Sequence, residues 1–396
     1  MAIGSATRHP LVEAALTLEP TIRACAEQVE RDGRLPDDLV RALSESGIFR
    51  MLVPKALGGG EVDPVTYSDV LEILSRADGS TGWVTMIATG SSWGMAFLPG
   101  ESAAEILRDP YTVMAGSFAL PSGGRAYAVD GGYRVTGRWP FGSGCQHATW
   151  MVGHSVVYDG DAPRLGPNDA PVTRVMVFPQ KDATIIPTWD VIGMNGTGSH
   201  DYAVGDLFVP ERFTFALDGE TAYHDGPLYK GRFFLVAHSS HALGIARAAI
   251  DALMELVATK RQSGGAVGGL VRDRPHIQMA VAQAEALVRG ARAYVRETTR
   301  EVFEEATTTG TIAPDSRALV RLSITSSFES CRQAVDLMYT AASGSSVYRR
   351  SPLQRYFRDM HTATQHSVVG PGGNELIGQA LLSGGAVDRH TGRRLF

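Results

Sequence analysis

The apolar residues of this chain change their spacing twice, and the resulting order of helices, strands and helices constrains its fold most. They recur at helical spacing in the first part, for example at Leu39 and Leu43. From about Val113 the chain consists of short β-branched runs between glycine, asparagine and aspartate, and helical patterns return near Gly226. We predict an α+β fold with an N-terminal helical domain (1–112), a small β-barrel or sandwich domain (113–225) and a C-terminal four-helix bundle (226–396).

The pattern also predicts the individual elements. Two helices are expected from Pro36 to Gly47 and from Pro64 to about Leu74, and a third, buried one contains Trp83. Asp130-Gly131-Gly132 is typical of a hairpin turn. Strands are expected at Ala126–Val129, Tyr133–Thr136, Trp150–Val157, Thr173–Phe178 and Ala203–Val209. The long helices of the bundle are expected at Phe234–Arg261, Pro275–Glu305, Asp315–Ala342 and Leu353–Val369.

Charge and cysteine content exclude several classes of function. The net charge of -5 provides no basic field for nucleic acid or an anionic membrane surface, so neither is expected as a partner. Cys25, Cys145 and Cys331 are far apart and odd in number, which argues against a disulfide framework or a structural zinc site. Residues 1–10 lack the apolar core of a signal peptide, and no run is apolar enough to span a membrane. We expect a protein of the reducing cytoplasm.

Four strings resemble segments of the acyl-CoA dehydrogenase superfamily, and they occur in the family's order. "LSESGIFRMLVPKALGG" (43–59) resembles the N-terminal helix and its exit, and "VTGRWPFGSGCQHATW" (135–150) resembles the flavin-contact strand. "IGMNGTGSHDYAVGDLFVPERF" (192–213) resembles the segment that closes the β domain, and "SPLQRYFRDMHTATQH" (351–366) resembles the active-site helix. The resemblance covers almost the whole chain and implies the same three-part architecture.

The residues after Arg358-Asp359 distinguish the branches of that superfamily. Where the dehydrogenases commonly have a tyrosine and the glutamate that abstracts the substrate proton, this chain has His366 and Ser367. A histidine there, a serine like Ser143 and the "GTGS" string (196–199) resemble the two-component flavin-dependent monooxygenases, also called group D hydroxylases. The chain departs from many of them in having Ser92, rather than histidine, before the tryptophan of the third helix.

This resemblance implies an oxygenase component that works with reduced flavin, either FADH2 or FMNH2. A separate NAD(P)H:flavin reductase would supply the flavin, and O2 would react with it to give a C4a-hydroperoxide that hydroxylates a small, aromatic substrate such as a phenol, an indole or a polycycle. The resemblance also implies a homotetramer with flavin sites near subunit boundaries.

Two residues are predicted to take part in the chemistry. Ser143 lies between Gly142 and Gly144, which allow the backbone to approach the flavin, and its hydroxyl can accept the N5 hydrogen bond. His366 is the expected acid or base, because imidazole titrates near neutral pH. His361 lies five residues earlier, about 140° around a helix, and is not expected on the same face.

Binding residues follow from the same resemblance. Expected flavin contacts are Trp139, Phe141, Gly142, Ser143, Gly144, Thr197 and Ser199. Arginine pairs at helical spacing, with a serine-rich loop, are expected to bind the flavin phosphates, namely Arg274 with Gln278, Arg355 with Arg358, and Ser343. Residues expected at the substrate are Trp83, Ser92, Trp93 and His366, although the aromatic residues of the third helix could equally form core.

Some other interpretations of the sequence are excluded by the spacing of their residues, and others remain open. Gly193, Gly196 and Gly198 have the wrong order and context for a dinucleotide loop. His238 and His241 could share a helix face, but they lack a third metal ligand at suitable spacing, so no metal site is predicted. Rival functions are an acyl-CoA dehydrogenase or oxidase with a relocated glutamate, an N-oxygenase acting on an amino sugar, and a non-catalytic assembly subunit.

Overall fold

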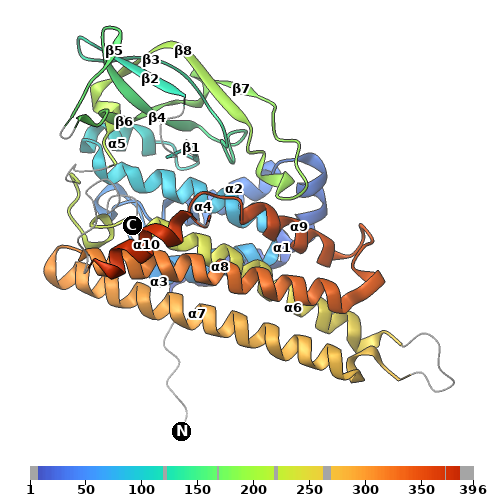
Figure 1. Ribbon diagram of the computed structural model, residues 1–396. Helices are drawn as coiled ribbons and strands as arrows, with labels where there is room; N and C mark the ends of the chain where they lie inside the picture. Colours follow the sequence, from blue (N-terminus) through green and yellow to red (C-terminus); the bar gives the residue numbers. More distant parts are fainter. Residues whose placement is uncertain are drawn as a thin grey trace.

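The computed structural model describes residues 8–118, 123–166, 169–217, 222–261, 269–370 and 372–383. Helices occupy both ends of the chain and a sheet occupies the middle, which confirms the predicted α+β class (Figure 1). The helices are α1 (Pro10–Asp32), α2 (Asp37–Glu45), α3 (Pro64–Ala77), α4 (Gly79–Trp93), α5 (Gly100–Leu107), α6 (Ala237–Thr259), α7 (Pro275–Thr309), α8 (Pro314–Ala342), α9 (Pro352–Ala363) and α10 (Gly372–Leu382). The residue limits of the three domains stay a prediction.

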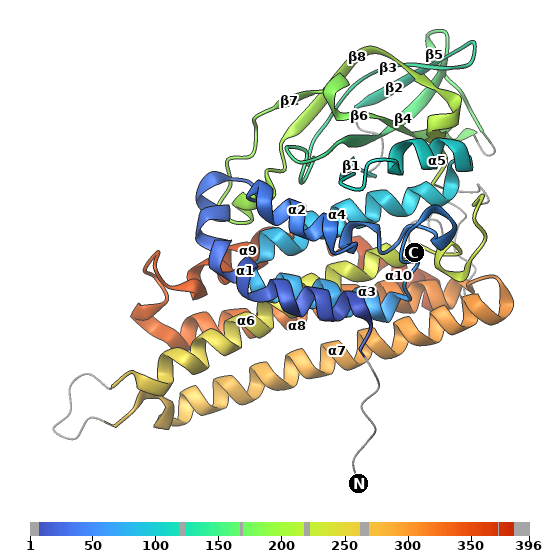
Figure 2. The same cartoon turned by 180° about the vertical axis from the view of Figure 1, so that it is seen from behind.

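Helix α4 is the predicted buried helix, and it lies between the sheet and the bundle (Figures 1 and 2). Its N-terminus is capped by Asp78, whose carboxylate accepts the Thr81 backbone N–H at 2.8 Å. Every residue of α4 except Ile87 is buried. Helix α1 is not among the individual predicted elements. Its first part is only partly buried, and Pro20 interrupts its pattern, so the sequence alone marks its limits poorly.

The β domain forms one mixed sheet. Its strands are β1 (Met114–Ser117), β2 (Gly124–Val129), β3 (Gly132–Trp139), β4 (Trp150–Asp159), β5 (Ala162–Pro163), β6 (Thr173–Pro179), β7 (Thr184–Ile186), β8 (Asp201–Pro210) and β9 (Thr214–Phe215). The order is β7-β8-β3-β2-β4-β6-β9, and β1 and β5 also pair with β4. The five predicted strands lie within β2, β3, β4, β6 and β8, and the other four have only two to four residues each.

The predicted hairpin is confirmed at the turn between β2 and β3. Val129 pairs with Gly132 in antiparallel register, and Gly131 has a φ of +75°, a backbone conformation that favours glycine. In contrast, β4 runs parallel to β1 and to β2, so the sheet combines both pairings.

The C-terminal part contains three long helices, α6, α7 and α8, close to their predicted limits. The predicted helix at Leu353–Val369 exists but is too long at its C-terminal end, because α9 ends at Ala363 and α10 begins only at Gly372. Beyond α9 the backbone N–H of Val368 bonds to the His366 ring instead of a helical carbonyl. His366 therefore lies in a turn rather than on a helix. None of the helices in the described ranges is long and apolar enough to cross a membrane.

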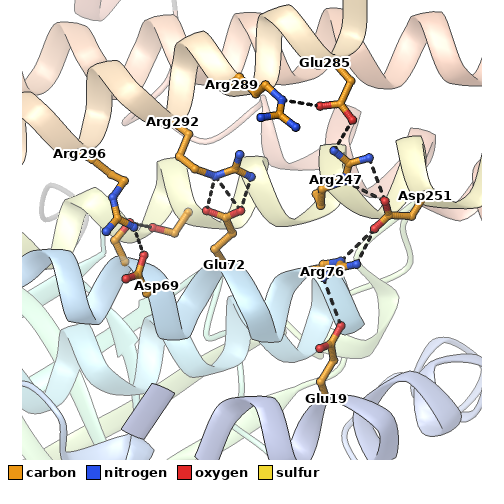
Figure 3. A network of polar contacts seen from close by, with 12 residues as sticks. Glu19, Asp69, Glu72, Arg76, Arg247, Asp251, Glu285, Arg289, Arg292 and Arg296 are labelled. Atoms are coloured by element: carbon orange, nitrogen blue, oxygen red, sulfur yellow. Dashed lines mark hydrogen bonds and ion pairs between the residues drawn. The ribbon is translucent and has the colours of Figure 1, made fainter. Parts of the chain in front are cut away.

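A polar network holds the N-terminal helices against the bundle (Figure 3). The Nε of Arg292 on α7 donates to both carboxylate oxygens of Glu72 on α3 at 3.1 Å, and Arg296 pairs with Asp69 one turn further on. Arg76 of α3 pairs with Asp251 of α6 at 2.7 Å. Removing these charges partly from water costs free energy that offsets much of their attraction, so the network adds little net stability. Its main effect is to orient α3 on α6 and α7.

Candidate active site

Two loops of the β domain, residues 141–145 and 195–199, are held together by backbone hydrogen bonds. The N–H of Gly142 donates to His200 O, and the N–H of Gly144 donates to Thr197 O, both at 2.8 Å. Gly144 has a φ of +76°, and a β-carbon there would lie 3.1 Å from a Val84 methyl group, so glycine is required. The two strings that resemble flavin-contact segments thus form one surface facing α4.

Three hydroxyl groups form a hydrogen-bonded chain on this surface. Thr197 Oγ1 lies 2.8 Å from Met194 O, and Ser199 Oγ lies 2.7 Å from both Thr197 Oγ1 and Ser143 Oγ. The indole N–H of Trp83 on α4 donates to Ser143 Oγ at 3.2 Å. All three hydroxyl residues are at most 3% exposed, which shields the chain from water.

The direction of this chain follows from its two ends. The Met194 carbonyl can only accept, so Thr197 donates to it, Ser199 must donate to Thr197, and Ser143 must donate to Ser199. The indole of Trp83 can only donate. Ser143 therefore donates its single proton to Ser199 and accepts the Trp83 N–H with one lone pair. Its other lone pair can accept a hydrogen bond from one more donor.

A carboxylate of α9 fixes the far end of the chain. Asp359 Oδ1 accepts the backbone N–H of Met194 at 2.6 Å, and Asp359 is 3% exposed. Burial raises the pKa of this carboxyl to about 7, although the Met194 N–H acts in the opposite direction. The Arg-Asp pair noted in the sequence thus positions the loop that carries Thr197 and Ser199.

Three histidine rings surround Trp83. Its indole makes edge contacts with His238, His241 and His366, at centroid distances of 5.8, 5.0 and 5.5 Å. The rings of His238 and His366 lie 4.7 Å apart. His238 and His241 come from one face of α6, so the sequence-based expectation that they share a face is confirmed. Among the described residues no group of three or more histidine, cysteine or acidic side chains is arranged to hold a metal ion.

Hydrogen-bond partners assign different tautomers to His238 and His366. His238 Nδ1 faces Leu235 O at 3.0 Å, so Nδ1 carries the proton and Nε2, which is buried without a partner, is an acceptor. His366 Nδ1 accepts the Val368 N–H at 3.2 Å, so the neutral ring carries its proton on Nε2. The pair thus offers one acceptor and one donor on rings whose centroids lie 4.7 Å apart.

All three rings are neutral near pH 7. Burial, followed by the nearby Arg321 charge, lowers the pKa of His366 to about 4, and burial lowers the pKa of His241 to about 4. Burial and the neighbouring His366 lower the pKa of His238 well below its ordinary value. A neutral imidazole can accept or donate a proton, so these rings are suited to acid and base roles.

These shifts predict a pH-dependent stability. Between about pH 4 and 6.5 the unfolded chain binds protons that the folded His241 and His366 do not, so stability should rise with pH, by up to about 3 kcal/mol per histidine. Asp359, with a pKa raised to about 7, acts in the opposite direction, as do Asp69 and Asp78, whose pKa values burial also raises. His147 and His238, whose pKa values burial lowers, add to the rise. Urea unfolding at pH 4.5, 5.5 and 6.5 should show a rising free energy of unfolding, and a flat or falling series would contradict the assignment.

The two aromatic residues among the predicted flavin contacts differ in their exposure to solvent. Trp139 is buried inside the β domain, where its indole stacks on Tyr202 and donates to His154 O at 2.8 Å. Phe141, in contrast, has a φ of +63° and a ring that is 61% exposed, in edge contact with Trp189. Only Phe141 of these two presents its ring outward.

The predicted arginine pairs have protein partners or lie elsewhere. Arg358 pairs with Glu30 and also donates to Gln354 at 2.7 Å and to Ile192 O at 2.5 Å, while the charge of Arg355 is balanced by Asp78 and Asp359. Arg274, Gln278 and Ser343 lie at the end of the bundle where α6 meets α7 and α8 ends (Figure 1). None of the five is part of the hydroxyl chain.

Two predicted substrate contacts also point elsewhere. Ser92 Oγ donates to Ala88 O within its own helix at 2.8 Å. Trp93 packs between Phe97 and Phe234, at centroid distances of 4.6 and 5.0 Å. His361 pairs with Asp336 of α8 at 2.8 Å. The structure thus brings together Trp83, Ser143, Thr197, Ser199 and His366. It adds His238, which the sequence analysis considered only as a metal ligand and set aside.

The fold and this site define the class of protein. Residues 13–99 match the family model described as "Acyl-CoA dehydrogenase, N-terminal domain", and residues 236–371 match "Acyl-CoA dehydrogenase, C-terminal domain". The chain belongs to the acyl-CoA dehydrogenase superfamily and, as its relatives show, to the flavin-dependent monooxygenases within it.

Particular relatives cover nearly the whole chain. The indole-3-acetate monooxygenase of Pseudomonas putida is 35% identical over 88% of this chain and 87% of that protein. The flavin-dependent monooxygenase oxygenase subunit HsaA of Rhodococcus jostii is 30% identical over 89% and 93%. Among solved structures, 3-HSA hydroxylase from Rhodococcus sp. RHA1 has a TM-score of 0.86 at 26% identity, covering 97% of this chain and 99% of that one. XiaF from a Streptomyces species, in complex with FADH2 and glycerol, has a TM-score of 0.83 at 27% identity, covering 94% and 95%.

Proposed function

We propose that this chain is the oxygenase component of a two-component monooxygenase that hydroxylates a small aromatic substrate. It receives reduced flavin, FADH2 or FMNH2, from a separate NAD(P)H:flavin reductase and uses O2. The observation that carries this proposal is the directed hydroxyl chain, which leaves Ser143 as an acceptor beside Trp83 and two neutral histidines. The relatives named for indole-3-acetate oxygenation and the FADH2-bound neighbour support it.

The residues present fit a reduced flavin. Bound flavin supplies the electrons and carries the oxygen atom that is transferred from O2. Ser143 has a lone pair for the flavin N5–H, and it cannot act as a donor there because its proton is held by Ser199. Phe141 presents an exposed ring next to it. The low exposure of the hydroxyl chain keeps water from competing for the same hydrogen bond.

The two histidines would have different roles at the substrate. An aromatic substrate with an O–H or N–H group would donate to His238 Nε2, which is buried and lacks a partner. The neutral His366 would donate a hydrogen bond from Nε2 to the oxygen on which negative charge develops, and it would keep its proton. This refines the sequence-based role of His366, because its Nδ1 is already occupied by the Val368 N–H.

The rival dehydrogenase reaction needs a carboxylate base at the substrate. The described residues that contact Trp83 through a ring or a side-chain hydrogen bond are Ser143, His238, His241 and His366. None of them is acidic, so the geometry favours oxygenation.

Rapid mixing with oxygen tests the function. Anaerobic protein loaded with reduced flavin should give a transient absorbance that persists before oxidised flavin appears, and an aromatic substrate should shorten it while hydroxylated product forms. Loading with oxidised flavin and an acyl-CoA is the control for the rival reaction. Direct reoxidation without a transient, or bleaching of oxidised flavin by acyl-CoA, would contradict the proposal.

We also propose that four copies associate through the helical bundle. A groove between α7 and α8 is lined mainly by apolar surface, including Leu287 and Leu337, and Met279 nearby is 63% exposed. A neighbouring copy covering it would bring Arg274 and Gln278 near another subunit. Light scattering of the purified protein should give the mass of four chains, and a monomer at micromolar concentration would contradict this.

We also propose a cellular compartment for this protein, based on the state of its cysteines. All three, Cys25, Cys145 and Cys331, are free thiols in the structure, and two of them are buried. Free thiols suit a reducing compartment such as the cytoplasm.

A further inference from the structure

Arg321 of α8 is a buried cation without a counter-ion. Its side chain belongs to a residue that is 8% exposed, and Nη2 makes one weak hydrogen bond, to Ser367 O at 3.3 Å. Its Nε is fully buried and has no hydrogen-bond partner. None of the carboxylates in the described part of the chain pairs with it. The arginines of the network in Figure 3 each have an acidic partner, whereas Arg321 has none among the described residues.

Such an arrangement is unfavourable unless an anion completes it. Moving a cation out of water without pairing it costs several kcal/mol, and proteins rarely retain one without a ligand or a partner. Burial, together with the charge of Arg232, lowers the pKa of Arg321 to about 10, which still leaves the guanidinium charged at neutral pH.

One side of the guanidinium is covered by a glycine rather than by an acidic side chain. Gly373, in the first turn of α10, lies over it, and a β-carbon at that position would be 3.6 Å from Nη2 and 3.7 Å from Nε. Glu375, the acidic residue of the same turn, is exposed and does not pair with it. The nearest turn of α10 therefore contributes no side chain that could neutralise Arg321.

Arg321 is adjacent to the proposed reaction site. It bonds to the carbonyl of Ser367, the residue after His366. Its positive charge contributes to the lowered pKa values of both His366 and His238, as expected of a cation close to these two rings. Arg321 therefore lies on the His366 side of the proposed site.

We propose that Arg321 binds the carboxylate of the substrate, so that the enzyme acts on aromatic acids rather than on neutral phenols or indoles. The planar guanidinium offers two adjacent N–H groups, which match the two oxygens of a carboxylate. The acid group would be held at Arg321 while the ring, with its O–H or N–H directed to His238, faces Ser143 and the flavin. This inference rests on the proposed function for the position of the ring, and it adds the substrate class.

Paired ligands test the charge directly. Calorimetric titration of the full-length protein under anaerobic conditions, with reduced flavin bound, would use 4-hydroxyphenylacetate and indole-3-acetate together with their neutral primary amides. Because a hydrogen bond to a charged group is strong, each acid should bind roughly 10- to 100-fold more tightly than its amide. Equal affinities of acid and amide in the wild-type protein would overturn the proposal.

Substitutions of Arg321 test whether this residue causes the preference for acids over amides. Arg321→Met should remove the preference for the acids and leave the affinity for the amides within about threefold, since a methionine of similar length replaces an unpaired cation. Its melting temperature should be unchanged or higher, whereas an arginine with a purely structural role would lower it. Arg321→Lys should retain part of the preference. Arg289→Met, which removes an exposed charge on α7, is the matched control and should keep the preference in full.

The same titrations separate the other outcomes. A phosphate of the flavin is the alternative anion, so reduced flavin and riboflavin are titrated into both proteins; a loss of flavin affinity in Arg321→Met without a change for the acids would overturn the proposal. Acid binding that depends on Arg321, without any oxygenated product, would contradict the proposed function alone. Equal hydroxylation of acids and amides would contradict the substrate class alone.

Discussion

Replacing Ser143 by alanine is expected to shorten the oxygen-dependent flavin transient by roughly 10-fold or more. The change removes the only acceptor that the hydroxyl chain leaves for the flavin N5–H, and a buried donor left without a partner costs about 1–3 kcal/mol. The indole N–H of Trp83 would also lose its partner. The measurement is stopped-flow absorbance without substrate, in which the decay of the transient is followed to oxidised flavin.

Two further variants make the Ser143 result specific. Ser327 is equally buried but donates only to Ile324 O within α8, so Ser327→Ala should leave the decay unchanged. Thr197→Val removes the end of the chain that fixes its direction, and Ser143 could then turn its proton toward the flavin. We expect Thr197→Val to shorten the transient less than Ser143→Ala does. An unchanged decay in Ser143→Ala, with flavin still bound, would exclude the assigned acceptor role.

Loss of His238 is expected to decrease product formation by about 100-fold or more, which is the usual contribution of a positioned acid or base. The reason is that His238 Nε2 is a buried acceptor without a protein partner, beside the ring of His366. In His238→Ala the oxygen consumed should appear mainly as hydrogen peroxide, because the flavin still reacts while the substrate keeps its proton. Product and peroxide are quantified in single turnovers.

The pH dependence distinguishes the two histidines. A phenolic substrate loses its proton to solvent as the pH approaches about 10, so product formation by His238→Ala should recover at high pH. His366→Ala lacks a donor rather than an acceptor and should not recover. His361→Asn, which changes contacts with Asp336 and Phe357 away from the site, is the control and should retain wild-type product yield. Recovery of both variants, or of neither, would contradict the division of roles.

Much of the fold could be read from the spacing of apolar residues. The long helices α6, α7 and α8 and the five main strands were predicted because an amphipathic helix or a half-buried strand must repeat its apolar positions over many residues. Short strands such as β5 and β9, with two residues each, leave no such repeat. Helix α9 was predicted too long because the helical pattern of apolar residues continues in the sequence after Ala363. The backbone turns there instead, and the N–H of Val368 donates to the His366 ring.

For the site, the sequence determined which chemical groups are present, and the tertiary structure decided which of them meet. Ser143, Thr197, Ser199 and His366 were identified because their strings resemble segments of the flavin-dependent monooxygenases, and the chemistry of a hydroxyl group and an imidazole suits the expected roles of Ser143 and His366. Their distances to Trp83 and Met194 depend on the packing of α4 and α9 against the β-domain loops, so only the folded chain shows that Ser143 must accept. Likewise, sequence spacing cannot reveal that the Nε2 of His238 and the Nε of Arg321 lack partners. Whether a buried polar atom is satisfied depends on residues far along the chain, which is a property of the tertiary structure alone.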